Sequence, residues 1–219
     1  FLACWSFESG LSMKRAIRSE MQQKLKLLTK EYVELQSLVA CRNLFSLPQF
    51  ENSKAFSVYL SMGGEIDTEA ILEKGFANNK RVYIPKITGK KSEDMFMLEV
   101  ANAQTINSFA KNSWGIPEPS MDLIRDSVDG TSTGIIDLIL LPGVAFDSSC
   151  NRLGHGKGYY DNFIGRISAA NNDFGKDPPY LIGLALDEQI IESVPLEPHD
   201  EMLDAIVTPT TVYFKNGDK

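Results

Sequence analysis

The stretch "GIIDLILLPGVAF", residues 134–146, is the most apolar run in the chain, and it decides the fold. Its aliphatic residues follow one another almost without interruption between Ile135 and Leu141. A strand with one solvated face alternates apolar and polar residues, whereas a central parallel strand is covered on both faces and is apolar throughout. We therefore expect residues 134–146 to form one central strand of a parallel sheet.

The segments around this run alternate between strand-like and helix-like patterns. Residues 55–62 and 80–87 have the pattern of strands, and residues 63–79 between them have that of a turn and a helix. This order is typical of a βαβ unit. Further strands are expected at residues 94–100, 179–186 and 205–214, a helix at 158–171, and a proline-containing loop at 111–120.

The N-terminal part of the chain is expected to be helical. Residues 13–47 contain no glycine or proline, and their apolar residues recur at steps of three and four, which predicts one long helix or two consecutive helices. The fold class is therefore α/β, with three α/β/α layers, a mainly parallel central sheet and a long N-terminal helical segment. We interpret residues 13–214 as a single domain. Residues 1–12 lack the basic start of a signal peptide, and we interpret them as an extension or a cloning-derived segment.

Composition limits the partners. The 219 residues carry a net charge of −7, and this acidic balance argues against nucleic acid, which needs a basic face. No apolar run approaches the roughly 20 residues of a membrane span, so we expect no membrane partner either. Cys4, Cys41 and Cys150 are odd in number and widely spaced, which predicts free thiols in a reducing compartment. We expect a cytoplasmic monomer and leave a mitochondrial location open.

A glycine-rich stretch, "RLGHGKGYYD" at residues 152–161, follows the apolar run. Ligands of open α/β sheets bind beyond the carboxyl ends of the strands, where this stretch is expected to lie. Glycines at positions 154, 156 and 158 let the backbone approach a ligand closely, and successive N–H groups can form an anion-binding nest. The start of a helix near Tyr159 adds a partial positive charge. The stretch therefore predicts a phosphate-binding loop.

Two observations keep that prediction open at this point. A Walker loop requires Ser or Thr after its lysine, but Lys157 is followed by Gly158, and Tyr159 stands where a dinucleotide fingerprint has its third glycine. A simple turn between strand and helix, with solvated basic residues, is the alternative reading.

The stretch and several further motifs together resemble the 5-formyltetrahydrofolate cyclo-ligase family. The resemblance runs from Met13 to about Phe214 and rests on ordered matches: "KRAIR", "YLSMGGEIDTEAI", "VYIPK", "SWGIPEP", "PGVAFD", "NRLGHGKGYYD" and "VPLEPHDEMLDAIVTP". It implies ATP- and Mg²⁺-dependent cyclisation of 5-formyltetrahydrofolate to 5,10-methenyltetrahydrofolate, with release of ADP and phosphate. The alternatives are a non-catalytic regulator that binds a sugar phosphate or nucleotide on a similar frame, and a sugar-phosphate isomerase.

The resemblance also assigns roles to individual residues. It implies ATP binding by Lys14, Arg18, Arg152, Gly154, Gly156, Lys157, Gly158, Tyr159 and Tyr160. It implies folate binding by Leu60, Glu65, Met95, Trp114, His155, Gly156, Lys157, Gly158 and Tyr159. Asp161 and Asp200 would hold Mg²⁺, and Arg152 and Lys157 would be catalytic by neutralising developing charge.

Taken one at a time, several of these residues have a simpler interpretation. Lys14 and Arg18 are four apart and share one face of a helix, which could also be a solvated face. Leu60 and Met95 could pack in the core, and Trp114 could be a packed anchor of its loop. His155 stands where the family often has Arg or Tyr, so its role stays open.

Overall fold

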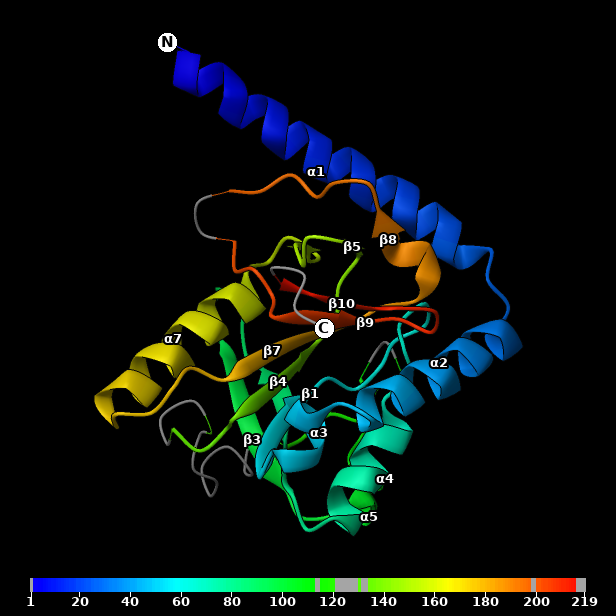
Figure 1. Cartoon of the computed structure of the whole chain (residues 1–219), viewed down its shortest axis with the longest axis vertical. Helices are drawn as coiled ribbons and strands as arrows, with labels where there is room; N and C mark the ends of the chain where they lie inside the picture. The colour runs from blue at the N-terminus through cyan, green and yellow to red at the C-terminus, as the bar shows by residue number, and fades with distance from the viewer. Residues whose placement is uncertain (1, 113–114, 121–129, 131–133, 198–199, 216–219) are drawn as a thin grey trace.

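The computed structural model describes residues 2–112, 115–120, 130, 134–197 and 200–215, with side chains from residue 10 onward. The N-terminal part forms α1 (Leu2–Lys26), α2 (Lys30–Phe45) and the short α3 (Pro48–Asn52). The helical conformation is interrupted between α1 and α2. There the Thr29 side chain accepts a hydrogen bond from Tyr32 N and caps α2. Two consecutive helices therefore replace a single long one, and α1 extends beyond the rest of the molecule (Figure 1).

A seven-stranded sheet forms the centre of the molecule. Its strands lie in the order β10 (Val212–Phe214), β9 (Ala205–Val207), β7 (Tyr180–Leu184), β4 (Leu138–Leu141), β1 (Ala55–Val58), β2 (Arg81–Ile87) and β3 (Met95–Val100). The five inner strands are parallel, and only β10 and β3 at the two edges pair antiparallel. The expected mainly parallel sheet is confirmed, as is the βαβ unit formed by β1, α4 (Glu69–Ala77) and β2. The short α5 (Ala103–Asn107) follows β3.

The central strand is buried on both faces, as its composition predicted. Leu138 and Leu140 pack in the core that includes α2 and α4, whereas Ile139 and Leu141 pack in a second core that includes α7 (Tyr159–Asp173). This alternation follows from the two-residue period of a strand. Figure 1 shows α7 on one side of the sheet and α2 and α4 on the other, which gives the expected three layers.

The apolar run at residues 134–146 is nevertheless not one strand, so that part of the prediction was wrong. Strand β4 ends at Leu141, and β5 (Ala145–Asp147) belongs to a second sheet, between β6 (Arg152–Leu153) and β8 (Ile190–Ile191). Proline at position 142 lacks an N–H for a continued ladder, and a side chain at Gly143 would collide with the Phe146 ring. The chain therefore turns out of the large sheet.

The expected strand at residues 205–214 is similarly divided into β9 and β10, which pair antiparallel around a turn closed by Thr208 N donating to Thr211 O. The expected strand at 55–62 is shorter and ends at Val58. A 3₁₀ turn, η2 (Asp187–Gln189), precedes β8.

The small sheet determines where α1 lies. Met21 of α1 packs with Val144, Leu153 and Val194, and Ile17 and Ile191 pack against this cluster. β6 leads directly into the glycines at positions 154, 156 and 158. The packing of α1 on the small sheet therefore holds one face of α1 close to these glycines.

Cys41 and Cys150 are free and buried, as predicted for two of the three cysteines. Burial raises the pKa of Cys41 to about 12 and that of Cys150 to about 11, so both are protonated thiols at neutral pH. None of the helices in the described part of the chain has the length and apolar character needed to cross a membrane.

Candidate active site

The glycine-rich stretch comprises β6, a loop and the first turn of α7, and two of its three glycines have the special backbone conformation that was expected. Gly156 and Gly158 have φ values of +86° and +69°, which favour glycine, and Gly158 is the N-cap residue of α7. Gly154 differs, because a Cβ there would lie 2.9 Å from Arg152 Nη1. Gly154 therefore provides space for the Arg152 side chain. Residues 154–158 form an exposed to partly buried loop at the start of a helix, and we call them the glycine loop.

Helix α1 brings its basic residues to this loop. Arg18 Nε donates to Gly154 O at 2.8 Å, and a Cβ on Gly156 would lie 3.2 Å from Arg18 Cζ. Lys14, one turn earlier, is 4% exposed and faces the body of the protein. The structure therefore places Lys14 and Arg18 on one face, as their spacing predicted, and excludes the solvated-face alternative for Lys14.

Lys14 does not contact the glycine loop directly in this conformation. Its Nζ donates to Glu197 Oε2 at 3.0 Å and to Asp200 Oδ2 at 2.5 Å. Asp200, one of the two predicted metal ligands, is therefore paired with a predicted phosphate-binding lysine. Sequence reasoning did not assign any role to Glu197, because a contact across 183 residues leaves no trace in local spacing.

The buried Arg152 and the partly buried Asp161 form a second ion pair. Arg152 Nη2 donates to Asp161 Oδ1 at 2.8 Å, Nη1 donates to Pro142 O at 3.3 Å, and the guanidinium lies 5.7 Å from the centre of the Tyr160 ring. Arg152 is 8% exposed. As placed, Arg152 orients Asp161 at the carboxyl end of β4, whereas Lys157 is exposed in the glycine loop.

Glu65 lies beside the glycine loop, next to His155. It is 8% exposed, its Oε2 accepts from Met62 N at 2.9 Å, and its Oε1 is 3.7 Å from His155 Nε2. Tyr160 lies near Glu65 and Arg152. Burial first and then the Glu65 carboxylate raise the pKa of Tyr160 well above its usual value, while Arg152 acts in the opposite sense. Tyr160 is therefore a neutral donor and acceptor at neutral pH.

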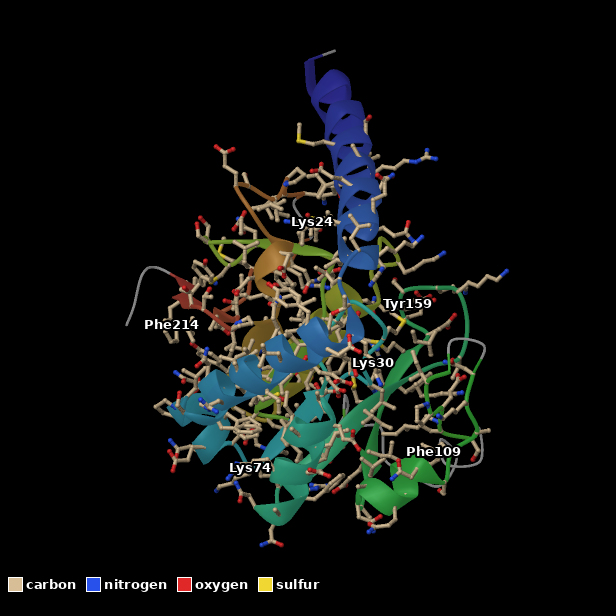
Figure 2. All side chains as sticks on the ribbon, turned by 90° about the vertical axis from the view of Figure 1, so that its right-hand side faces the viewer. Lys24, Lys30, Lys74, Phe109, Tyr159 and Phe214 are labelled. Carbon is tan, nitrogen blue, oxygen red and sulfur yellow. The ribbon has the colours of Figure 1, made fainter. Side chains whose placement is uncertain are left out.

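A neighbouring loop that sequence reasoning missed brings two further lysines close to the site, together with Glu93 and Asp94. Tyr159 Oη donates to Gly89 O at 2.9 Å, and a Cβ on Gly158 would lie 3.6 Å from Ser92 Cβ. The loop between β2 and β3 therefore lies beside the glycine loop, where Figure 2 labels Tyr159. It exposes Lys90 and Lys91. The adjacent lysines in "TGKKSED" were the available signal.

Three predicted folate contacts have different outcomes. Leu60 lines a hollow of about 250 Å³ together with Ser61, Leu72, Ile106 and Pro117. Met95 is 0% exposed and packs in the core that includes α7, so the structure favours the packing alternative for it. Trp114 lies outside the described residues.

The two candidate metal ligands, Asp161 and Asp200, do not belong to a preformed cluster of acidic side chains in the described part of the chain. Among the residues that the structure describes, no group of three or more His, Cys, Asp or Glu side chains could hold a metal ion. Asp161 and Asp200 are each paired with a basic side chain, Arg152 and Lys14 respectively. Oxygen donors of this kind suit Mg²⁺ when phosphate oxygens and waters complete its shell.

Comparisons with known proteins agree with one another. A model of the 5-formyltetrahydrofolate cyclo-ligase family matches residues 11–209. The 5-formyltetrahydrofolate cyclo-ligase of Mus musculus is 36% identical over 196 residues, covering 90% of this chain and 93% of its own. A probable 5-formyltetrahydrofolate cyclo-ligase of Caenorhabditis elegans is 37% identical over 201 residues, covering 90% and 95%. The NMR structure of 5,10-methenyltetrahydrofolate synthetase of Aquifex aeolicus superposes with a TM-score of 0.72 and 26% identity, covering 94% and 95%.

Proposed function

Because the chain belongs to the 5-formyltetrahydrofolate cyclo-ligase family, a family of ligases, we propose that it converts 5-formyltetrahydrofolate to 5,10-methenyltetrahydrofolate with consumption of ATP. One observation supports this most directly. The glycine loop lies between Arg18, which contacts it at Gly154, and Glu65, which approaches it at His155. A nucleotide and a folate can therefore meet at the two sides of one loop.

The nucleotide side consists of backbone donors and basic side chains. The N–H groups of the glycine loop and the N-terminus of α7 suit an anion, and the triphosphate of ATP is the anion that this ligase reaction requires. Arg18 and the exposed Lys157 supply positive charge on either side of Gly156. Lys14 lies one helical turn from Arg18, close enough for its ammonium to reach phosphate oxygens once it leaves its carboxylate partners.

Asp161 and Asp200 fit a magnesium ion that arrives with the nucleotide. Mg²⁺ is commonly held in proteins by one or two carboxylates together with phosphate oxygens and waters. The cation supplies charge neutralisation on the phosphate oxygens. The buried Arg152 keeps Asp161 in place, and the Glu197 backbone N–H keeps Asp200 in place by donating to its Oδ2 at 2.7 Å.

The folate side is formed by Glu65, Leu60, His155 and Tyr159. The Glu65 carboxylate is buried and accepts hydrogen bonds, so it suits the N–H groups of a pterin ring. Leu60 provides apolar contact at the hollow beside it. Met95 is expected to support the wall from within the core rather than to touch the ligand.

The reaction needs no protein nucleophile. The formyl oxygen attacks the γ-phosphorus, a new O–P bond forms, the bridging P–O bond to ADP breaks, and ADP leaves. N10 then bonds to the activated formyl carbon and loses its proton, and the C–O bond to phosphate breaks. Positioning and charge stabilisation dominate such phosphoryl transfers. We assign the charge stabilisation to Lys157, and to Arg18 in place of the predicted Arg152, because Arg152 is paired with Asp161.

The test is a product assay. The purified protein is incubated with 5-formyltetrahydrofolate and Mg·ATP, and the absorbance of the methenyl product is followed while ADP is measured in the same tube. We expect one ADP per methenyl product and no product when ATP is omitted or Mg²⁺ is chelated. Tight binding of ATP without any turnover would contradict the proposal and favour a regulator. We also propose a cytoplasmic monomer, which light scattering during gel filtration and localisation in cells would test.

A further inference from the structure

The Lys14 ammonium is enclosed by two carboxylates. The side chains of Lys14, Glu197 and Asp200 are 5%, 12% and 16% exposed, and the ammonium contacts both acidic groups. Because these three side chains are largely removed from water, the attraction between the ammonium and the two carboxylates is poorly screened.

The Asp200 carboxylate is held in place by contacts that do not involve Lys14. Asp200 Oδ2 accepts from Glu197 N at 2.7 Å, and Asp200 N donates to Glu197 O at 3.0 Å. The Glu197 backbone N–H therefore orients the Asp200 carboxylate, while the Glu197 side chain adds the second contact to the ammonium. Such a carboxylate pair attracts cations in general, and the lysine is the cation that occupies it in this structure.

Three ligands would affect this cluster differently. A divalent metal alone would lie beside the Lys14 ammonium, and like charges repel. A nucleotide without metal would bring phosphate oxygens toward two carboxylates. A metal–nucleotide complex avoids both conflicts, because its phosphates would bind the Lys14 ammonium and its metal would bind the Asp200 carboxylate.

We propose that Lys14 is an internal counter-ion that keeps divalent metal off the Glu197–Asp200 pair until nucleotide phosphates draw its ammonium away. The inference rests on the proposed function, in which Lys14 binds phosphate and Asp200 binds Mg²⁺. Glu197 is then a positioning residue that holds Lys14 while the site has no nucleotide. The metal consequently enters together with the nucleotide and not before it.

The required movement is small. Arg18 follows Lys14 by one turn, about 6 Å along the helix axis, and already contacts the glycine loop. A lysine ammonium is a point charge on a flexible stem that can exchange partners by rotation of the side chain. Helix α1 itself stays packed through Met21 on the small sheet.

The experiment counts bound Mn²⁺ by electron paramagnetic resonance in the full-length protein without nucleotide. We expect weak binding by the wild type and at least about tenfold tighter binding by Lys14→Met, which keeps the stem and removes the charge. Lys14→Arg should behave like the wild type, and adding Glu197→Gln to Lys14→Met should remove the gained affinity. Lys30→Met, which removes an exposed lysine paired with Glu34, is the matched control and should change nothing.

Two results would overturn the inference. One is a Lys14→Met variant, folded by circular dichroism, that binds Mn²⁺ no better than the wild type. The other is wild-type protein that binds Mn²⁺ alone as tightly as it binds Mn·ATP, which needs no variant. Failure of the proposed function has a different signature, because wild-type protein would then bind no Mn·ATP at all.

Discussion

The two aspartates predicted to bind metal are each paired with a buried basic side chain, but the two pairs are built differently. Arg152 and Asp161 are nine residues apart, on β6 and in the first turn of α7. Lys14 and Asp200 are 186 residues apart, on α1 and in the segment before β9. Arg152 also donates to Pro142 O and lies against Tyr160, whereas the ammonium of Lys14 contacts two carboxylates, those of Glu197 and Asp200.

The difference separates a framework contact from an exchangeable one. A guanidinium with several directional partners cannot leave Asp161 without also losing its contacts with Pro142 O and the Tyr160 ring. A lysine between two carboxylates can leave one partner at a time. We infer that the Arg152–Asp161 pair maintains the shape of the site, and that the Lys14–Asp200 pair changes when ligands bind.

The largest expected effect is at the glycine loop, which Arg18 connects to the helix that carries Lys14. Gly156→Val should abolish ATP binding, because φ at this position is +86° and the new side chain would press on the Arg18 guanidinium, 3.2 Å from its Cβ. The exposed loop can distort without unfolding the core, so circular dichroism should be unchanged. If calorimetry showed that the variant binds ATP with wild-type affinity, Gly156 would not be part of an anion-binding nest.

Lys157→Ala should lower turnover by roughly a hundredfold to a thousandfold, the usual result of deleting one preorganised charge stabiliser. Lys157 is exposed in the glycine loop, so its loss should not reduce stability. Steady-state rates of methenyl formation measure the effect, with Lys26→Ala, another exposed lysine, as control. A variant that kept most of its turnover would make Lys157 a solvated loop residue.

Arg152→Met should destabilise the protein by about 3 kcal/mol, because it leaves Asp161 partly buried without its cation. Urea unfolding measures this, and added Mg²⁺ without nucleotide should not restore the loss. The same titration on Lys14→Met should show partial restoration by Mg²⁺, since its two carboxylates then accept the metal. If Mg²⁺ changed the stability of both variants to the same extent, the proposed difference between the Arg152–Asp161 and Lys14–Asp200 pairs would be wrong.

Asp161→Asn and Glu65→Gln should separate the metal side of the site from the folate side. Asp161→Asn should raise the Mg²⁺ requirement at saturating folate. Glu65→Gln should raise the folate requirement by roughly tenfold to a hundredfold, from a lost charged hydrogen bond of about 1.5–3 kcal/mol, and leave the Mg²⁺ requirement unchanged. Both variants are titrated in both ligands. If each variant shifted both curves alike, the two assignments would lose their support.

Much of the fold was predictable because single segments carry the information. The aliphatic run around Leu138 contains enough apolar residues for two buried faces, and the five inner strands are parallel as it implied. The sequence did not predict that this run is divided into two strands at Pro142 and Gly143. The proline is apparent in the sequence, but the need for glycine at position 143 is not. A side chain there would collide with Phe146, whose position depends on the second sheet.

The candidate site was predictable to a similar degree. The glycine pattern and the four-residue spacing of Lys14 and Arg18 identified elements that do converge. Spacing could not show that Lys14 pairs with Glu197, because that contact joins opposite ends of the chain. It also could not show that Met95 faces the core, since β3 has apolar residues on both faces.

The smallest expected effect tests whether burial, rather than charge alone, makes Lys14 distinctive. Lys30 also pairs with a carboxylate, Glu34 at 3.4 Å, but the two side chains are 86% and 52% exposed at the start of α2, where Figure 2 labels Lys30. Exposed i,i+4 pairs are screened by water and salt and contribute about 0.5 kcal/mol or less. Lys30→Met should therefore change the free energy of unfolding in urea by no more than about 0.5 kcal/mol.

Lys14→Met, measured without metal, should lower the free energy of unfolding several times more. Two carboxylates that are 12% and 16% exposed would then repel each other with little screening. Repeating both measurements at high salt sharpens the contrast, since salt should reduce the small effect at Lys30 and leave most of the effect at Lys14. Similar losses in the two variants would show that Lys14 is an ordinary surface cation, and the exchange proposed for it would then lack its physical basis.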